Sequence, residues 1–214
     1  MKYIKLLSLV ALLSLLSGNA YSQISAGGQL SFLKFMKGSD VKHLGLGLKG
    51  EYAVDDEKVV VVGFDYYLPY TPVYEFNAHA LSSETTPSNI DVEVEGKITW
   101  FHVHAGMKYY FTGDYEDDFN LYGFAGIGFI SGTVKSEVLT EYDEDAYELR
   151  LEDEEKVSSL TLNLGIGAEF DINFGYLFAD FKFMLPPNNV NGQVVAVNID
   201  PGLQLNAGIR IPFD

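Results

Sequence analysis

The chain has 214 residues and a formal net charge of −16 at pH 7, and it contains no cysteine. The negative charge argues against nucleic acid as a partner, because proteins bind phosphates through lysine and arginine. The lack of cysteine excludes disulfide bonds within the chain and lipid attachment through an N-terminal cysteine.

The first residues have the composition of a secretory signal peptide. Two lysines form a basic start, and the apolar run Leu6–Leu16 follows. That run has the length of a signal-peptide core and is too short to be a helix that spans a membrane. Ala20 and Ser22 are small residues at the −3 and −1 positions of a cleavage site. The sequence therefore predicts a signal peptide over 1–22 and one mature domain over 23–214.

Eight segments of the mature chain alternate between apolar residues and small or polar residues. This pattern is typical of strands whose two faces meet different surroundings. Each segment has about ten residues, the length that a tilted strand needs to cross a bilayer. In chain order the segments are Ser25–Phe35, His43–Val54, Val59–Leu68, Thr99–Phe111, Leu121–Phe129, Leu160–Asp171, Tyr176–Met184 and Leu203–Phe213.

The fifth segment, LYGFAGIGF, holds three glycines and raises the question of a phosphate-binding loop. A dinucleotide fingerprint needs G-x-G-x-x-G between a strand and a helix. Counting from Gly126, the third glycine would fall at Ser131, and the residues that follow have strand character. The segment is better interpreted as a strand with one apolar face, Leu121 to Phe129, and one face that is partly glycine.

Glycine on the second face distinguishes a membrane barrel from a soluble β-sandwich, which also alternates. Glycine is a poor residue for a solvated strand surface. It suits the interior of a narrow closed barrel, because eight strands leave only enough room for side chains. We therefore expect an all-β fold, an eight-stranded antiparallel up-and-down transmembrane β-barrel.

The connections support this topology, because short and long links alternate after the first. Outer-membrane barrels have short periplasmic turns and longer extracellular loops. Aromatic residues near the strand ends predict the two interfacial girdles of such barrels. The outer girdle is predicted to contain Tyr66, Tyr67, Tyr70 and Trp100, and the periplasmic girdle Tyr109, Phe111, Phe119, Phe170 and Phe174.

The strands LYGFAGIGF and LNLGIGAEF and the final GLQLNAGIRIPF resemble the small outer-membrane β-barrel proteins of the OmpA/OmpX type. The resemblance covers the whole mature chain. It implies a porin-like barrel in the outer membrane of a Gram-negative bacterium, surrounded by outer-membrane lipid. Family members commonly end in an aromatic residue that the barrel-assembly machinery reads, whereas here Phe213 is penultimate. The resemblance lies in pattern, so it indicates fold more than function.

Acids and bases are nearly balanced on the predicted lumen face. Charges shielded from water must pair, or each costs several kcal/mol. We therefore expect salt bridges that plug the barrel, with a small gated pore as the alternative. The lumen residues are Lys49, Glu51, Asp65, Lys108, Glu169, Asp171, Asp180, Lys182 and Arg210, of which Arg210, Glu169, Glu51 and Lys108 should form one layer.

His102 and His104 stand two residues apart on the lumen face, and H-x-H on a strand can supply two metal ligands. No cysteine joins them and the carboxylates are scattered along the chain. We therefore expect packed or hydrogen-bonded histidines, with no metal and no cofactor. Asp65 should face His102 if the third and fourth strands pair around Leu68 and Thr99.

A lipid-modifying outer-membrane enzyme is the rival function. Its chemistry needs a histidine within hydrogen-bond reach of a serine. No lipid-facing pair of this kind is visible in the sequence, and His79 with Ser82 or Ser83 lies in a loop. We therefore expect no catalytic residues.

Two long extracellular loops, 69–97 and 136–156, are the expected carriers of function, because scaffolds place binding on loops. The first contains Tyr70, Tyr74 and Phe76, exposed aromatics of the kind enriched at interfaces. The second has ten carboxylates and two bases, and its pattern predicts a projecting hairpin. We expect a non-catalytic structural anchor or interaction protein, with an extracellular or membrane protein, or a surface polysaccharide, as partner.

Overall fold

The computed structural model describes residues 24–36, 42–151, 154–187 and 199–213. The predicted signal peptide over 1–22 lies outside the described residues and stays a prediction. No helix in the described part of the chain has both the length and the apolar character needed to span a membrane.

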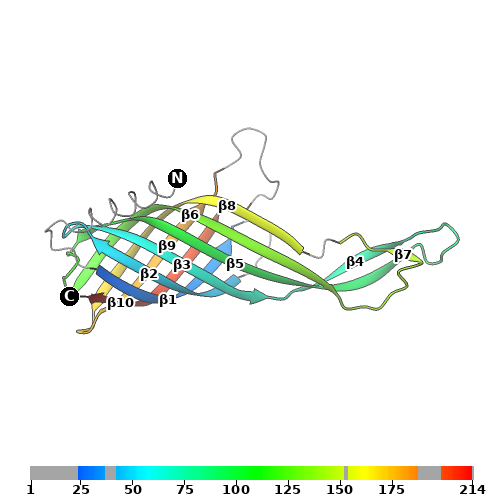
Figure 1. Ribbon diagram of the computed structural model, residues 1–214, viewed down its shortest axis with the longest axis horizontal. Coiled ribbons are helices and arrows are strands. Elements are labelled where there is room, and N and C mark those ends of the chain that lie inside the picture. Colours follow the sequence, from blue (N-terminus) through cyan, green and yellow to red (C-terminus); the bar gives the residue numbers. More distant parts are fainter. Residues whose placement is uncertain (1–23, 37–41, 152–153, 188–198, 214) are drawn as a thin grey trace, which may run out of the picture.

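Ten strands make up the described fold, and eight of them close into a ring (Figure 1). Around the ring the order is β1, β2, β3, β5, β6, β8, β9 and β10, and β10 pairs with β1 again; every pairing is antiparallel. The other two strands, β4 and β7, lie outside it. The bounds are β1 Ile24–Phe35, β2 Lys42–Ala53, β3 Lys58–Tyr70, β4 Val73–Ala80, β5 Asn89–Thr112, β6 Phe119–Val138, β7 Tyr147–Glu148, β8 Glu154–Asp171, β9 Tyr176–Leu185 and β10 Gly202–Phe213.

The eight predicted strands are the eight strands of the ring, so the predicted barrel is confirmed. The apolar residues of the alternating pattern also face outward, as predicted. In β2, Leu44, Leu46 and Leu48 are 54%, 57% and 67% exposed, whereas His43 and Lys49 on the other face are buried. Because apolar side chains cover the outside and polar ones fill the inside, the wall suits hydrocarbon rather than water.

The predicted girdle residues near the short turns, such as Tyr109 and Phe170, are exposed, whereas those near the long loops follow the prediction only in part. Tyr66 is exposed, but Tyr67 is fully buried, Trp100 packs against the cluster inside the barrel, and the ring of Tyr70 lies beside that of the buried His43. For Tyr67 and Trp100 the prediction was wrong because it weighed their place near the strand end over their parity. Tyr67 and Trp100 are opposite one another in the β3–β5 register and share the inward face with Asp65.

Three ring strands run well beyond the barrel, farther than the sequence predicts (Figure 1). The 24-residue β5 begins at Asn89 and so includes the last part of the predicted loop 69–97, and β4 pairs with this extension. We call the projecting structure the arm: β4, residues 89–96 of β5, residues 136–138 of β6, and the segment 139–151 with β7.

Among the described residues of the predicted acidic hairpin over 136–156, the chain turns at the expected tip, 143–146, but the two sides do not pair with each other. The first residues of this segment continue β6 along β5, and Tyr147 in β7 pairs with Ala80 in β4. The physical reason is burial. Ala78 and Val92 form an apolar face on the arm, and this face needs a cover that the barrel cannot reach. The side chains that cover it are Ile90, Tyr142, Tyr147, Leu149 and Leu151.

Candidate functional site

A layer of paired charges lies inside the barrel, formed by residues that the sequence places on the lumen face. Nζ of Lys108 lies 2.6 Å from Glu51 and 2.5 Å from Glu169. Arg210 lies 2.8 Å from Glu169 and 3.5 Å from Glu51, and Lys49 lies 3.0 Å from Glu51. All five side chains are buried. The layer therefore meets the requirement that buried charges be paired.

Aromatic side chains complete this layer. The Arg210 guanidinium lies 4.2 Å from the ring centre of Tyr115 and 3.9 Å from that of Tyr176, within the range of cation–π attraction. The Tyr110 hydroxyl donates a 2.8 Å hydrogen bond to Glu169. Rings and ion pairs therefore pack against one another inside the barrel.

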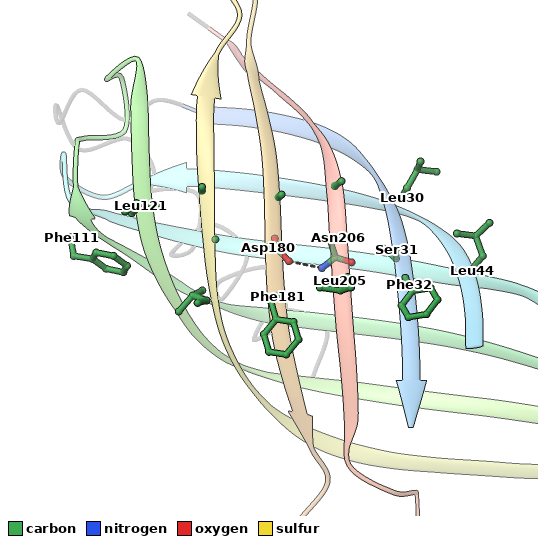
Figure 2. A pocket seen from close by; sticks show the side chains of 15 residues that line it. Leu30, Ser31, Phe32, Leu44, Phe111, Leu121, Asp180, Phe181, Leu205 and Asn206 are labelled. Atoms are coloured by element: carbon green, nitrogen blue, oxygen red, sulfur yellow. Dashed lines mark hydrogen bonds between the residues drawn. The ribbon is translucent and has the colours of Figure 1, made fainter. Parts of the chain in front are cut away.

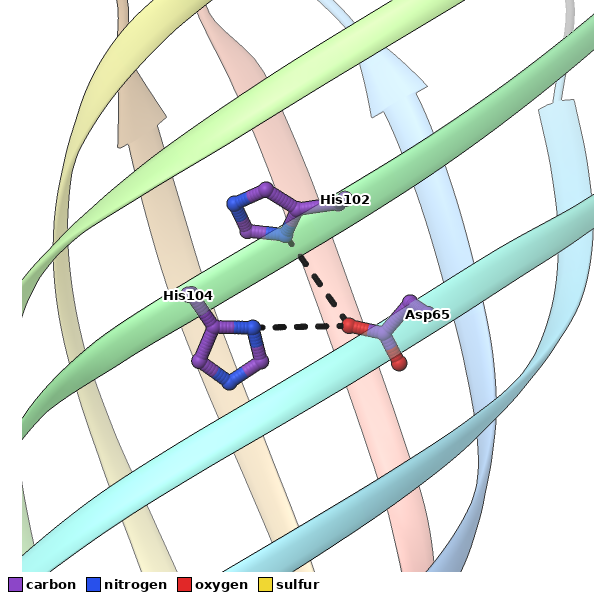
Figure 3. A group of neighbouring side chains, drawn as sticks. All are labelled: Asp65, His102 and His104. Atoms are coloured by element: carbon purple, nitrogen blue, oxygen red, sulfur yellow. Dashed lines mark ion pairs between the residues drawn. The ribbon is translucent and has the colours of Figure 1, made fainter. Parts of the chain in front are cut away.

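A second polar layer centres on Asp65 (Figure 3). As expected, Asp65 is directly opposite His102 in the β3–β5 register, and His104 lies two residues further along β5. The carboxylate of Asp65 accepts hydrogen bonds from Gln29 at 2.6 Å, from Ser31 at 2.5 Å and from Gln204 at 2.8 Å. Strands β1, β3, β5 and β10 therefore meet at one carboxylate, which alternation along a single strand cannot reveal.

Glycines on neighbouring strands make room for this layer. A Cβ atom on Gly47 would collide with Asp65, and one on Gly63 would collide with His104. The register places each of these glycines directly opposite the side chain that it accommodates. The glycine-rich polar face of the sequence is thus the space that the buried polar side chains of adjacent strands occupy.

Of the two aspartates predicted for the lumen on β8 and β9, only Asp180 lies in the interior. Asp180 is buried, accepts a 2.6 Å hydrogen bond from Asn206 and lies 3.5 Å from Lys182. Asp171, in contrast, lies at the end of β8 and accepts a hydrogen bond from the backbone N–H of Asn173 in the following turn. Asp171 has the inward parity, but the strand ends before its side chain can join the interior.

The arm carries an acidic face formed by one side of three strands. Glu75 is directly opposite Glu93, and Glu95 is directly opposite Glu137. Directly opposed residues of antiparallel strands lie on the same face, and like charges so placed are destabilising. The ion pairs described outside the barrel lumen use none of these carboxylates. We call Glu75, Asp91, Glu93, Glu95 and Glu137 the acidic face.

The base of the arm shows what pairing does to an acid of this region. Glu154 lies 2.7 Å from Lys156 and 3.3 Å from Lys135. Hydrogen bonds from Lys156 and Lys135 lower the pKa of the Glu154 carboxyl. None of the ion pairs among the described residues involves the acidic face, so its carboxylates remain available for positively charged groups from outside the chain.

The family profile described as outer membrane protein beta-barrel domain matches residues 7–211. The chain belongs to this family. This membership agrees with the closed ring and the apolar outer wall, and it places the protein in the outer membrane. A search of curated protein sequences finds no match to the chain.

Solved outer-membrane barrels share the fold. Neisserial surface protein A is 16% identical, with a TM-score of 0.55, over 92% of this chain and 100% of its own. A major outer membrane protein from Thermus thermophilus is 12% identical, with a TM-score of 0.54, over 91% and 100%. Ail of Yersinia pestis, solved with the heparin analogue sucrose octasulfate, is 17% identical, with a TM-score of 0.48, over 90% and 97%.

The outer wall of this outer-membrane barrel has a hollow of about 760 Å³ (Figure 2). Its lining includes Ala168, Ala179 and Ala207, small residues that are neighbours across β8, β9 and β10. Larger apolar side chains, including Phe32 and Phe181, also line it. Because this wall faces the bilayer, the hollow suits the acyl chain of a lipid.

The loop residues that an enzyme would require do not come together. His79 lies 2.6 Å from Asn89, and the hydroxyl of Ser82 accepts a hydrogen bond from the backbone N–H of Glu84. Within the described residues, these contacts give the loop histidine no serine partner. The expected aromatics of the first loop are exposed, with Tyr74 at 44% and Phe76 at 37%.

Proposed function

We propose that this outer-membrane barrel is a non-catalytic, non-conducting anchor. Its arm binds a protein or surface polysaccharide outside the cell. The acidic face is the observation that carries this proposal. The paired charges inside the barrel support the absence of a conducting path. The partner of His79 in the described loop is Asn89 rather than a serine, which supports the absence of catalysis.

The arm is suited to binding because it holds its charges in fixed positions. Backbone pairing of β4, β5 and β6 places the carboxylates at strand spacing, so a partner does not have to order them. Opposed pairs such as Glu75 and Glu93 repel each other, and a basic group or a divalent cation between them would relieve that repulsion. The partner's contact surface is therefore expected to be basic or cation-bridged.

The deletion experiment uses the register of the barrel. Tyr70 and Ile98 are directly opposite in β3 and β5, so an Asn-Gly turn can join these two strands in place of residues 71–97. The deleted protein should fold and remain heat-modifiable on gels, since its ring of strands is intact. Partners captured by co-purification from native membranes should be lost.

A charge variant separates the acidic face from the rest of the arm. Replacing Glu75, Glu93 and Glu95 by glutamine should weaken capture of the partner roughly tenfold or more. The matched control removes three charges from the exposed turn of the same arm, Asp143→Asn, Glu144→Gln and Asp145→Asn. Equal losses in the two variants, or full binding without residues 71–97, would show that the acidic face is not the binding surface.

A further inference from the structure

Three donor atoms converge in the lumen without bonding one another. Nδ1 of His102 lies 3.9 Å and Nδ1 of His104 lies 3.7 Å from Oδ2 of Asp65, and both point toward the carboxylate (Figure 3). These distances are too long for hydrogen bonds. Neither Nδ1 atom has another hydrogen-bond partner among the described residues, and all three side chains are at most 2% exposed.

The carboxylate keeps a free lone pair on the side that the histidines face. Oδ1 of Asp65 accepts hydrogen bonds from Gln29 and Ser31, whereas Oδ2 accepts one, from Gln204. A carboxylate offers about four acceptor sites, two on each oxygen. Three are therefore used, and the remaining one is on Oδ2. The hydrogen bonds from Gln29, Ser31 and Gln204 also fix the orientation of the carboxylate, as hydrogen bonds to metal-binding side chains do in metal sites.

Charge sets Asp65 apart from the other buried acids. Glu51 and Glu169 pair with Lys108, and Asp180 pairs with Lys182. The ion pairs described for Asp65 involve only the two histidines, which are charged only when protonated. A buried carboxylate with neutral partners is costly, and a cation at the free lone pair would offset that cost.

We propose that Asp65, His102 and His104 bind one divalent transition-metal ion of the zinc class inside the barrel. Two imidazole nitrogens and one carboxylate oxygen suit this class, and three protein ligands leave a fourth position for water. At metal–ligand distances of about 2.1 Å, tetrahedral donors lie about 3.4 Å apart. The two nitrogen-to-oxygen separations thus need to close by a few tenths of an ångström, and one ligand atom from each of the three side chains lies within 4.8 Å of the others.

The role of the ion would be structural, because the site lies between closed layers of side chains. It would tie β3 to β5 from inside the barrel, and it would enter while the barrel folds. The proposal goes beyond the anchor function. It concerns the barrel alone, so its test needs neither the arm nor a partner.

The first test measures metal retained by the folded protein. The chain is refolded in detergent with ZnCl2, excess metal is removed by gel filtration, and zinc per chain is measured by mass spectrometry. A gel shift on heating verifies that each variant is folded. Wild type should retain about one zinc per chain, and His102→Gln and His104→Gln should bind at least roughly tenfold more weakly.

The matched control is His43→Gln. His43 is a third buried lumen histidine, but it packs near Phe35, Tyr70 and Trp100, away from Asp65. This variant should retain zinc as the wild type does. Absence of zinc in the folded wild type, or an equal loss in His43→Gln, would overturn the proposal.

A second measurement uses the wild type alone, in case the variants do not fold. In 15N-histidine NMR spectra, adding zinc during refolding should shift the Nδ1 resonances of two of the four histidines. The cobalt-refolded protein should also gain visible absorption typical of a low-coordinate nitrogen and oxygen site. If an ordered water or a proton occupies the position instead, all four histidines will give the same spectra with ZnCl2 and with a chelator, which contradicts the proposal.

Discussion

At the scale of single residues, the lumen is governed by the cost of burying charge. Arg210 is fully buried, yet it lies against Glu51 and Glu169 and between the rings of Tyr115 and Tyr176. Its guanidinium also donates a hydrogen bond to the backbone carbonyl of Tyr115. Removing this cation breaks two buried ion pairs and one hydrogen bond at once, although Lys108 still pairs with both acids.

Arg210→Met should therefore lower the free energy of unfolding by about 3–5 kcal/mol, the usual cost of breaking a buried ion pair. Urea unfolding in detergent, followed by the heat-dependent gel shift, measures this loss. Arg150→Met is the matched control, since the side chain of Arg150 is 84% exposed and should contribute nothing measurable. A loss for Arg210→Met no greater than for the control would mean that the acids find other partners or become protonated.

At the scale of elements, β5 serves two environments with one continuous backbone. Its second half alternates between lipid and lumen, as at Val103 and His104. Its first half alternates between the acidic face and the buried side of the arm, as at Glu93 and Val92. Side chains alternate with a period of two in both halves, so the alternation alone does not predict where the barrel ends and the arm begins.

Val92→Asp should unfold the arm while the barrel stays folded. The substitution places an unpaired charge among the buried side chains of the arm, at a cost of about 3 kcal/mol or more. Limited proteolysis should then cleave within the arm, and the protected barrel should keep its gel shift on heating.

Glu93→Gln is the neighbouring control for that experiment. Glu93 is the neighbour of Val92 in β5 but lies on the other face of the strand, directly across from Glu75 in β4. Neutralising it removes a repulsion between like charges, so the variant arm should resist protease at least as well as the wild-type arm. Cleavage of both variants at the same rate would indicate that the buried side of the arm does not hold it together.

At the scale of the whole molecule, closure of the ring and filling of the lumen are linked. In the described fold, every ring strand pairs on both sides, so no strand edge faces the bilayer. Eight strands enclose a space just large enough for side chains. The buried residues described inside it include four acids and four lysines or arginines.

The wild-type protein should therefore show no large, steady conductance in planar bilayers. The triple variant Lys108→Ala, Glu169→Ala and Arg210→Ala removes the central members of the charged layer. If it folds, it should conduct more than the wild type, because water can then enter the lumen. Steady currents on the order of a nanosiemens from the wild type, comparable with those of wide barrels, would contradict the filled lumen.

Alternation in the sequence was sufficient to predict that eight strands form the ring, the face to which most of their side chains point and the composition of the charged layer. These properties are local or follow from the narrowness of an eight-stranded barrel, because parity and strand number decide which groups meet inside. The opposition of Asp65 and His102 could be predicted for the same reason, once β3 and β5 were taken as neighbours.

Only the tertiary structure decided what depends on contacts between distant parts of the chain. Tyr147 joins β4 in place of its own hairpin, because the apolar face around Val92 must be covered. Asp65 receives donors from β1 and β10, which lie far away in sequence and come together only when the ring closes. Burial and ring closure depend on contacts between distant residues, so the alternation along a single strand cannot predict them.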